Sequence, residues 1–148
     1  MSVHLLDANV LIALSWPHHL HHAKAHEWFH GTGRKAWATC PLVQIAFIRI
    51  SSNPKIIADA VTPREALEVL KKIVAVPGHH FWPDTVAPTD ANKAFASAAF
   101  VGHRQVTDAY LLSLAQHHKG KLATFDGGIA ELIPALKERH QHITLIEA

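Results

Sequence analysis

Short apolar runs alternate with segments of helical spacing along this chain, and the alternation limits the folds open to it. Each run is four or five residues long and contains small or β-prone residues. The five expected strands are Val3–Leu6, Lys35–Thr39, His79–Trp82, Lys121–Phe125 and Ile143–Ile146. Strands separated by helices of about 10–15 residues favour a parallel sheet with helices on both faces. The sequence therefore predicts an α/β fold.

The helix after Thr62 has the clearest local signals. Thr62-Pro63-Arg64-Glu65 is a capping box with proline at the first helical position. Apolar residues then fall on one face: Ala66, Leu67, Leu70, Ile73 and Val74. Four further helices are expected at Ala23–Phe29, at Pro41–Ile50, after Pro88-Thr89-Asp90, and after Thr107 as N-cap.

Length and composition favour one globular domain. The chain has 148 residues, of which 49% are hydrophobic, so we expect a single domain over residues 1–148 with its own core. No apolar run approaches the roughly 18 residues of a membrane span. The N-terminal run is interrupted by Asp7 and has no positive region before it, unlike a signal peptide. The single cysteine, Cys40, agrees with a reducing compartment, so a cytoplasmic location is expected.

Acidic residues are few, 12 in all, so their placement is informative. Asp7 and Asp126 each follow an expected strand, and ligands of open parallel sheets bind outside the carboxyl ends of the strands. Asp108 precedes Leu111 and Leu112 by three and four residues, so its carboxylate points along the apolar stripe of its helix. Asp108 either complements the positive N-terminus of that helix or belongs to a site with the other two aspartates.

A shared site for these three carboxylates needs a positive partner. Carboxylates about 4 Å apart repel by roughly 4 kcal/mol per pair at an effective dielectric constant of about 20. A hard divalent cation relieves that repulsion, and oxygen ligands select Mg²⁺ or Mn²⁺ over zinc. Such an ion can activate a water and neutralise charge on a phosphodiester. We therefore expect Mg²⁺ as cofactor, with Mn²⁺ as a substitute.

Three motifs follow one another along the chain: Leu-Leu-Asp-Ala-Asn-Val-Leu at 5–11, Val-Thr-Asp-Ala-Tyr-Leu at 106–111 and Leu-Ala-Thr-Phe-Asp at 122–126. Together they resemble the PIN-domain ribonucleases, specifically the VapC-type toxins of bacterial toxin–antitoxin pairs. Residues 38–54 and Phe81-Trp82-Pro83-Asp84 look like one branch of that family. The resemblance, which covers nearly the whole chain, implies a three-layer α/β/α sandwich, an Mg²⁺-dependent endoribonuclease, a cognate antitoxin as partner, and a homodimer.

The resemblance also implies roles for individual residues. Asp7 and Asp108 match the metal-binding aspartates of the family, and Asp126 matches its last acidic position, which is expected to orient the attacking water. Asn9 and Thr124 match polar positions that support these groups. Hydrolysis in this family would leave a 3′-hydroxyl and a 5′-phosphate.

One position departs from the family pattern. Many members have a glutamate in the helix after the second strand, where this chain offers Gln44, and no acidic residue lies between Glu27 and Asp59. An amide can supply an oxygen or a hydrogen bond but no negative charge. We therefore expect Gln44 to support the site, to weaken cation affinity and to put a second ion in doubt.

Basic residues and histidines give weaker signals. Arg49 and Arg104 are expected to contact phosphates of the RNA substrate, with ordinary surface charge as an equal alternative. His22, His26 and His30 recur every four residues on one helical face. Imidazoles at that spacing can bind zinc, but a solvated or partner-facing histidine face is the favoured interpretation.

Two other functions remain open from the sequence. A PIN-like module that binds RNA or a partner without strong catalysis would agree with the neutral Gln44. A phosphatase of the haloacid-dehalogenase type would use Asp7 as nucleophile, but such enzymes need a second aspartate two positions later, where this chain has Asn9.

Overall fold

The computed structural model describes residues 2–90, 102–133 and 135–147, and a five-stranded sheet lies at its centre. Its strands are β1 (His4–Leu6), β2 (Trp37–Thr39), β3 (His79–Phe81), β4 (Lys121–Thr124) and β5 (Ile143–Leu145). All neighbouring strands are parallel, in the order β3-β2-β1-β4-β5. Each expected strand is present with its ends within two residues of the prediction, and the predicted α/β fold is confirmed.

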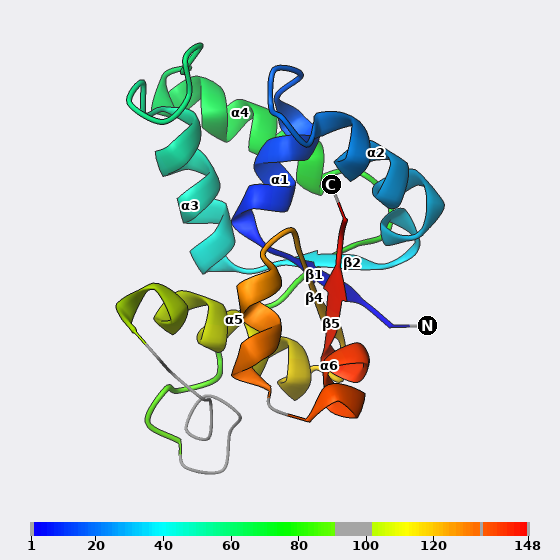
Figure 1. Ribbon diagram of the computed structural model, residues 1–148. Helices are drawn as coiled ribbons and strands as arrows, with labels where there is room; N and C mark the ends of the chain where they lie inside the picture. The colour runs from blue at the N-terminus through cyan, green and yellow to red at the C-terminus, as the bar shows by residue number, and fades with distance from the viewer. Residues whose placement is uncertain (1, 91–101, 134, 148) are drawn as a thin grey trace.

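Helices cover both faces of the sheet, which makes the three layers of the expected sandwich (Figure 1). The helices are α1 (Ala8–Ser15), α2 (His22–Gly31), α3 (Pro41–Ser51), α4 (Pro63–Val74), α5 (Val106–His117) and α6 (Leu136–His142). In Figure 1, α1 to α4 lie above the sheet, and α5 and α6 lie below it. Short 3-10 helices occur at Gly33–Lys35 (η1), His103–Gln105 (η3) and Gly127–Leu132 (η4).

The two central strands supply the most buried part of the core. Leu5 and Leu6 of β1 and Leu122 and Ala123 of β4 have no exposed surface. Parallel strands buried on both faces have near-continuous apolar sequences, and this is the pattern of both strands. The core therefore holds the carboxyl ends of β1 and β4 side by side, which is where Asp7 and Asp126 begin the next segments.

Two histidines of α2 cap the end of α1. The carbonyl oxygens in the last turn of a helix lack partners within the helix. His22 Nδ1 lies 2.7 Å from the carbonyl oxygen of Ala13, and His26 Nε2 lies 2.9 Å from that of Leu14. A solvated histidine face is therefore wrong for His22 and His26, which join α2 to α1, whereas His30 is exposed.

The start of α5 differs from the prediction. The helix begins at Val106 with Gln105 as N-cap and no side-chain capping bond, so the expected N-cap Thr107 lies inside the first turn. The physical reason is that η3 runs directly into α5, so the preceding turn already has helical backbone and needs no capping side chain.

The helix expected after Pro88-Thr89-Asp90 falls on residues 91–101, outside the described residues. Among the helices of the described ranges, none is long and apolar enough to cross a membrane.

The capping box of α4 is formed as predicted. The Glu65 backbone N–H donates to Thr62 Oγ1 at 3.1 Å, and the Thr62 backbone N–H donates to Glu65 Oε1 at 3.3 Å. Two of the otherwise unpaired amides at the helix N-terminus are thereby satisfied.

Loss of this cap should destabilise the protein measurably. We expect Thr62→Ala to lower the free energy of unfolding by about 1 kcal/mol, because the Glu65 amide loses its acceptor. Urea denaturation followed by circular dichroism measures the change. Thr62→Ser keeps the hydroxyl and is the matched control; equal destabilisation by both substitutions would contradict a capping role.

Candidate active site

The register of the sheet brings Asp7 beside Thr124. Leu6 pairs with Ala123, so the next residues on the two strands are neighbours. The Asp7 backbone N–H donates to the Ala123 carbonyl at 3.0 Å, and Thr124 Oγ1 donates to Asp7 Oδ2 at 2.8 Å. The end of β4 therefore fixes both the backbone and the carboxylate of Asp7.

The Asp7 carboxylate is buried, with 7% of the residue exposed. Asp7 is the N-cap of α1 but makes no side-chain capping bond to the second or third residue, which leaves its carboxylate turned toward Thr124. Burial raises the pKa of Asp7, and repulsion from Asp126 raises it further. Hydrogen bonds from the Thr124 hydroxyl and the Ala8 backbone N–H act in the opposite direction on this pKa. The site thus holds a carboxylate that is hydrogen-bonded but has little access to water.

Asp108 approaches the same site from the other side of the sheet. It lies in the first turn of α5 and is half-buried. Burial, followed by repulsion from Asp7 and then from Asp126, raises the pKa of Asp108 to about 6. Because these repulsions require proximity, the structure brings the Asp7 carboxylate near those of Asp108 and Asp126, which lie more than 100 positions later in the sequence.

Asp126 is more exposed than Asp7 and Asp108, and hydrogen bonds hold both its carboxylate and its backbone N–H. Its Oδ1 accepts the Gly128 backbone N–H at 2.9 Å as the N-cap of η4, and its own backbone N–H donates to Thr124 Oγ1 at 3.0 Å. The Thr124 hydroxyl therefore donates to Asp7 and accepts from Asp126. One buried hydroxyl fixes the relative positions of two of the predicted site residues.

Four further residues were predicted to belong to the site, and they lie on α1, α3 and η3: Asn9, Gln44, Arg49 and Arg104. Gln44 Nε2 donates to Thr39 Oγ1 at 3.0 Å, so the amide is tied to the end of β2. Asn9 is exposed on the first turn of α1. Arg49 is exposed in the last turn of α3, about 12 Å along the helix axis from Pro41 at the sheet edge, so the structure does not bring it to the carboxylates. Arg104 belongs to η3, and its side chain is outside the described residues.

The donor set fits a hard cation on two carboxylates. The described ion pairs are His18–Asp59, Lys24–Glu27 and Lys71–Glu68, and none of them neutralises the three aspartates. Within the described ranges no three His, Cys, Asp or Glu side chains are arranged to hold a metal ion together. Mg²⁺ nevertheless binds through one or two carboxylates and keeps several waters, so Asp7 and Asp108 suit it without a third protein ligand.

Asp84 is a fourth acid at this edge of the sheet, and it was not among the predicted site residues. Asp84 follows β3 and accepts hydrogen bonds from the Tyr110 hydroxyl, the Cys40 thiol and the Leu42 backbone N–H. Burial raises the pKa of Asp84, and burial together with the Asp84 charge raises the pKa of Cys40 to about 11 and that of Tyr110 to about 12. Asp84 thus joins the N-terminus of α3 to α5, the helix that carries Asp108. Its place three residues after the end of β3 was the signal that could have identified it.

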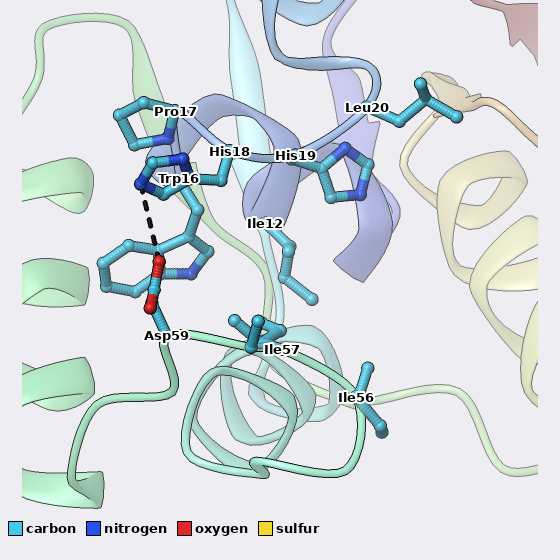
Figure 2. Close-up of a pocket in the computed structure, with 10 residues that line it drawn as sticks. Ile12, Trp16, Pro17, His18, His19, Leu20, Ile56, Ile57 and Asp59 are labelled. Atoms are coloured by element: carbon cyan, nitrogen blue, oxygen red, sulfur yellow. Dashed lines mark ion pairs between the residues drawn. The ribbon is translucent and has the colours of Figure 1, made fainter.

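Two cavities flank residues 16–21, which join α1 to α2. One has a volume of about 360 Å³ and is mainly apolar; it is lined by Ile12, Trp16 and residues 17–20 and 56–59. Figure 2 shows the His18–Asp59 ion pair at one end of this cavity, with a Nε2–Oδ2 distance of 3.6 Å, and Leu20 at the other. The other cavity has a volume of about 430 Å³ and includes two predicted site residues, Asn9 and Asp126. Of the three carboxylates, that of Asp126 therefore lines the second cavity.

Comparison with known proteins gives one family for the whole arrangement. The PIN domain model matches residues 4–133. Ribonuclease VapC38 of Mycobacterium tuberculosis strain H37Rv is 44% identical over 128 residues, which are 86% of this chain and 88% of that protein. Ribonuclease VapC39 of the same strain is 43% identical over 127 residues, 86% of this chain and 91% of that protein.

Solved structures show the same fold at low sequence identity. VapBC2 from Rickettsia felis, in a crystal structure with a DNA fragment from the promoter, matches with a TM-score of 0.62 and 9% identity over 97% of this chain and 98% of that one. FitAB bound to the IR36 DNA fragment matches with a TM-score of 0.62 and 13% identity, covering 97% and 94% of the two chains.

The clustered carboxylates predict an unusual pH dependence of stability. Burial and the neighbouring carboxylates raise the pKa of Asp108 from its ordinary value of 3.8 to about 6 in the folded protein, so the folded state holds more protons between these pH values. The free energy of unfolding should therefore fall as pH rises from about 4 to about 6. We expect Asp108→Asn to raise the free energy of unfolding at pH 7.5 by about 1 kcal/mol, a value that allows for the partial exposure of Asp108 to solvent. Near pH 4 the same substitution should have no such effect.

Thermal denaturation in EDTA at both pH values measures this difference, and Asp59→Asn is the matched control because Asp59 is exposed and remote from the cluster. A lower melting temperature of Asp108→Asn at pH 7.5 would show that the three carboxylates do not repel one another in the folded protein.

Proposed function

The chain belongs to the PIN-domain family and, within it, to the VapC proteins, and on that premise we propose that it is a metal-dependent endoribonuclease, the toxin of a toxin–antitoxin pair. The observation that carries the proposal is the convergence of Asp7, Asp108 and Asp126 at the carboxyl edge of a parallel sheet, where burial and then repulsion from the other two carboxylates raise the pKa of Asp108 to about 6. Such a cluster of buried like charges destabilises the fold. A bound cation would compensate the repulsion, so the cluster is explained by cation binding.

Mg²⁺, or Mn²⁺ in its place, would be held by Asp7 and Asp108. When bound, such an ion lowers the pKa of a coordinated water and neutralises charge on a phosphodiester. The Thr124 hydroxyl keeps the Asp7 carboxylate in one orientation, and the buried surroundings exclude competing water from it. Asp126 is exposed at the mouth of the site, where a carboxylate can orient the attacking water and accept its proton.

The other residues have supporting roles in this proposal. Asn9 lines the cavity next to Asp126 and can hydrogen-bond the substrate or a water. Gln44 is held by Thr39 and adds no negative charge, which favours one ion over two. Arg104 lies just before α5, where a cation can bind a phosphate of the RNA. The position of Arg49 at the far end of α3 restricts it to a phosphate distant from the cut.

We further propose that residues 1–148 act as one domain, in the cytoplasm, with a cognate antitoxin as partner and as a homodimer. The first and last strands of the chain, β1 and β5, belong to the same sheet, which supports a single domain. The structures with the same fold include complexes named VapBC2 and FitAB, both with DNA, which supports a partner protein.

A second candidate is an RNA-binding module with weak catalysis. It is favoured by the neutral Gln44 and by the lack, among the described residues, of three side chains arranged to hold a metal ion. Such a module would retard RNA in a gel without shortening it. The phosphatase alternative is disfavoured because Asn9 occupies the position of its second aspartate.

RNA digestion distinguishes nuclease from binding module. We expect single-stranded RNA to be shortened with Mg²⁺ or Mn²⁺ and to stay intact in EDTA. Asp7→Asn should lower the rate about 100-fold or more, because it removes one of two carboxylates from the cation. Gel analysis of end-labelled RNA measures both effects, with Asp59→Asn as a remote acidic control. RNA that is bound but never shortened by the wild type would favour the binding module.

Cation binding can be measured apart from activity. A ligand that binds only the folded state stabilises it, so millimolar Mn²⁺ should raise the melting temperature of the wild type by about 2–4 °C. Asp108→Asn should remove most of this shift, whereas Asp59→Asn should keep it. An equal shift in all three proteins would place the cation away from Asp7 and Asp108.

A further inference from the structure

The cavity beside the carboxylates is lined by aromatic rings as well as by polar groups. Its lining residues are Asn9, His19, Leu20, His21, Phe125 and Asp126. Three of them come from the connection between α1 and α2, and two from the end of β4. A loop far from β4 in the sequence therefore forms one wall of the cavity into which Asp126 opens.

His21 and Phe125 are stacked in this wall. Their ring centroids are 4.8 Å apart, and their planes differ by 27°. Both residues are half-buried, so the pair is held in place while part of it faces the cavity. Leu20, which is 88% exposed, extends this surface with a further apolar side chain.

His19 adds a directed hydrogen-bond donor to the same cavity. The His21 backbone N–H donates to His19 Nδ1 at 3.0 Å, so the Nδ1 atom carries a lone pair and the ring proton lies on Nε2. The same bond fixes the relative positions of the two histidines, whose ring centroids are 5.7 Å apart. The loop thus presents an aromatic face and an N–H donor together.

The neighbouring His18 has a different role. Figure 2 shows its ring directed toward Asp59 across the apolar cavity, with His19 and Leu20 farther along the loop. Of the two cavities beside this loop, His18 lines the apolar one and His21 lines the one next to Asp126. One loop therefore contains a matched pair of histidines, one inside and one outside the candidate binding surface.

We propose that the stacked pair of His21 and Phe125 is a platform for a nucleobase of single-stranded RNA, placed next to the phosphodiester that the carboxylate site cuts, with His19 Nε2–H as a donor to the same nucleotide. The inference rests on the proposed ribonuclease function. Unpaired bases stack on aromatic and histidine rings, whereas bases within a duplex have no free face. Stacking tolerates every base, so the platform supplies affinity and position with little sequence preference.

The test measures binding and cleavage of the same RNAs. The probes are a short 5′-fluorescein-labelled single-stranded RNA and a series in which one nucleotide at a time is abasic. Fluorescence anisotropy in EDTA measures the dissociation constant, and gel analysis with Mg²⁺ measures cleavage. The proteins are the wild type, His21→Ala, Phe125→Leu, the stacking replacement His21→Trp, and the control His18→Ala.

We expect His21→Ala and Phe125→Leu to raise the dissociation constant about tenfold, the effect of losing one stacked base. One abasic position should raise the wild-type dissociation constant by a similar factor and add nothing in His21→Ala, because base and ring act as a pair. His21→Trp should restore binding, and His18→Ala should match the wild type. Thermal denaturation of each variant checks that the fold is intact.

The outcomes separate this inference from the proposed function. Base-dependent RNA binding without cleavage by the wild type contradicts the ribonuclease and leaves the platform in place. Cleavage and affinity that are unchanged in folded His21→Ala overturn the platform alone, as expected if the surface binds a protein instead. Equal sensitivity of wild type and His21→Ala to every abasic position also overturns it, and a wild type that binds no RNA overturns both proposals.

Discussion

The burial of the Asp7 carboxylate at the end of the central strand is the constraint on which the site depends. A buried ionised group is costly unless hydrogen bonds or an opposite charge compensate it. Here Thr124 and the Ala8 amide supply part of that compensation, and no described ion pair supplies the rest. Asp108 and Asp126 add repulsion instead of relief. The arrangement therefore lowers the free energy of unfolding of the free protein. A bound cation would reduce that loss, as expected for a site selected for binding and not for folding.

Much of the fold could be predicted from sequence because the local and the global signals agree. The five strands are short apolar runs, and the α4 capping box is a local pattern with a local cause. The start of α5 was mispredicted because η3, which depends on tertiary packing, precedes it. Asp7 and Asp126 could be placed by the rule that parallel strands end at one edge. The same rule could have indicated Asp84, which follows β3, but not its partners on α3 and α5. The His21–Phe125 stack could not be predicted, because its two residues are distant in the sequence and carry no periodic pattern.

Gln44 and Asp84 together alter the electrostatics of this edge of the sheet. The Gln44 side-chain amide donates a hydrogen bond to the hydroxyl of the buried Thr39, so its position is fixed but it adds no charge. Asp84 does carry a charge, but it is committed to Tyr110, Cys40 and the first turn of α3. Its raised pKa follows from burial, and neither Asp7 nor Asp108 is among the groups that perturb it. Asp84 therefore does not supply the negative charge that Gln44 lacks, and the proposed cation site would depend on Asp7 and Asp108.

The sheet explains how the protein tolerates a cluster of like charges. The middle of the sheet is apolar and buried at Leu5, Leu6, Leu122 and Ala123, and burial of one leucine side chain stabilises the fold by about 1.5–3 kcal/mol. The charges begin only where the strands leave the core, so repulsion acts on side chains at an edge and not on the packed interior. The proposed nucleobase platform can then include the α1–α2 loop, because His21 of that loop stacks on Phe125 at the same edge. Changes in that loop should alter RNA binding while the sheet keeps the carboxylates in place.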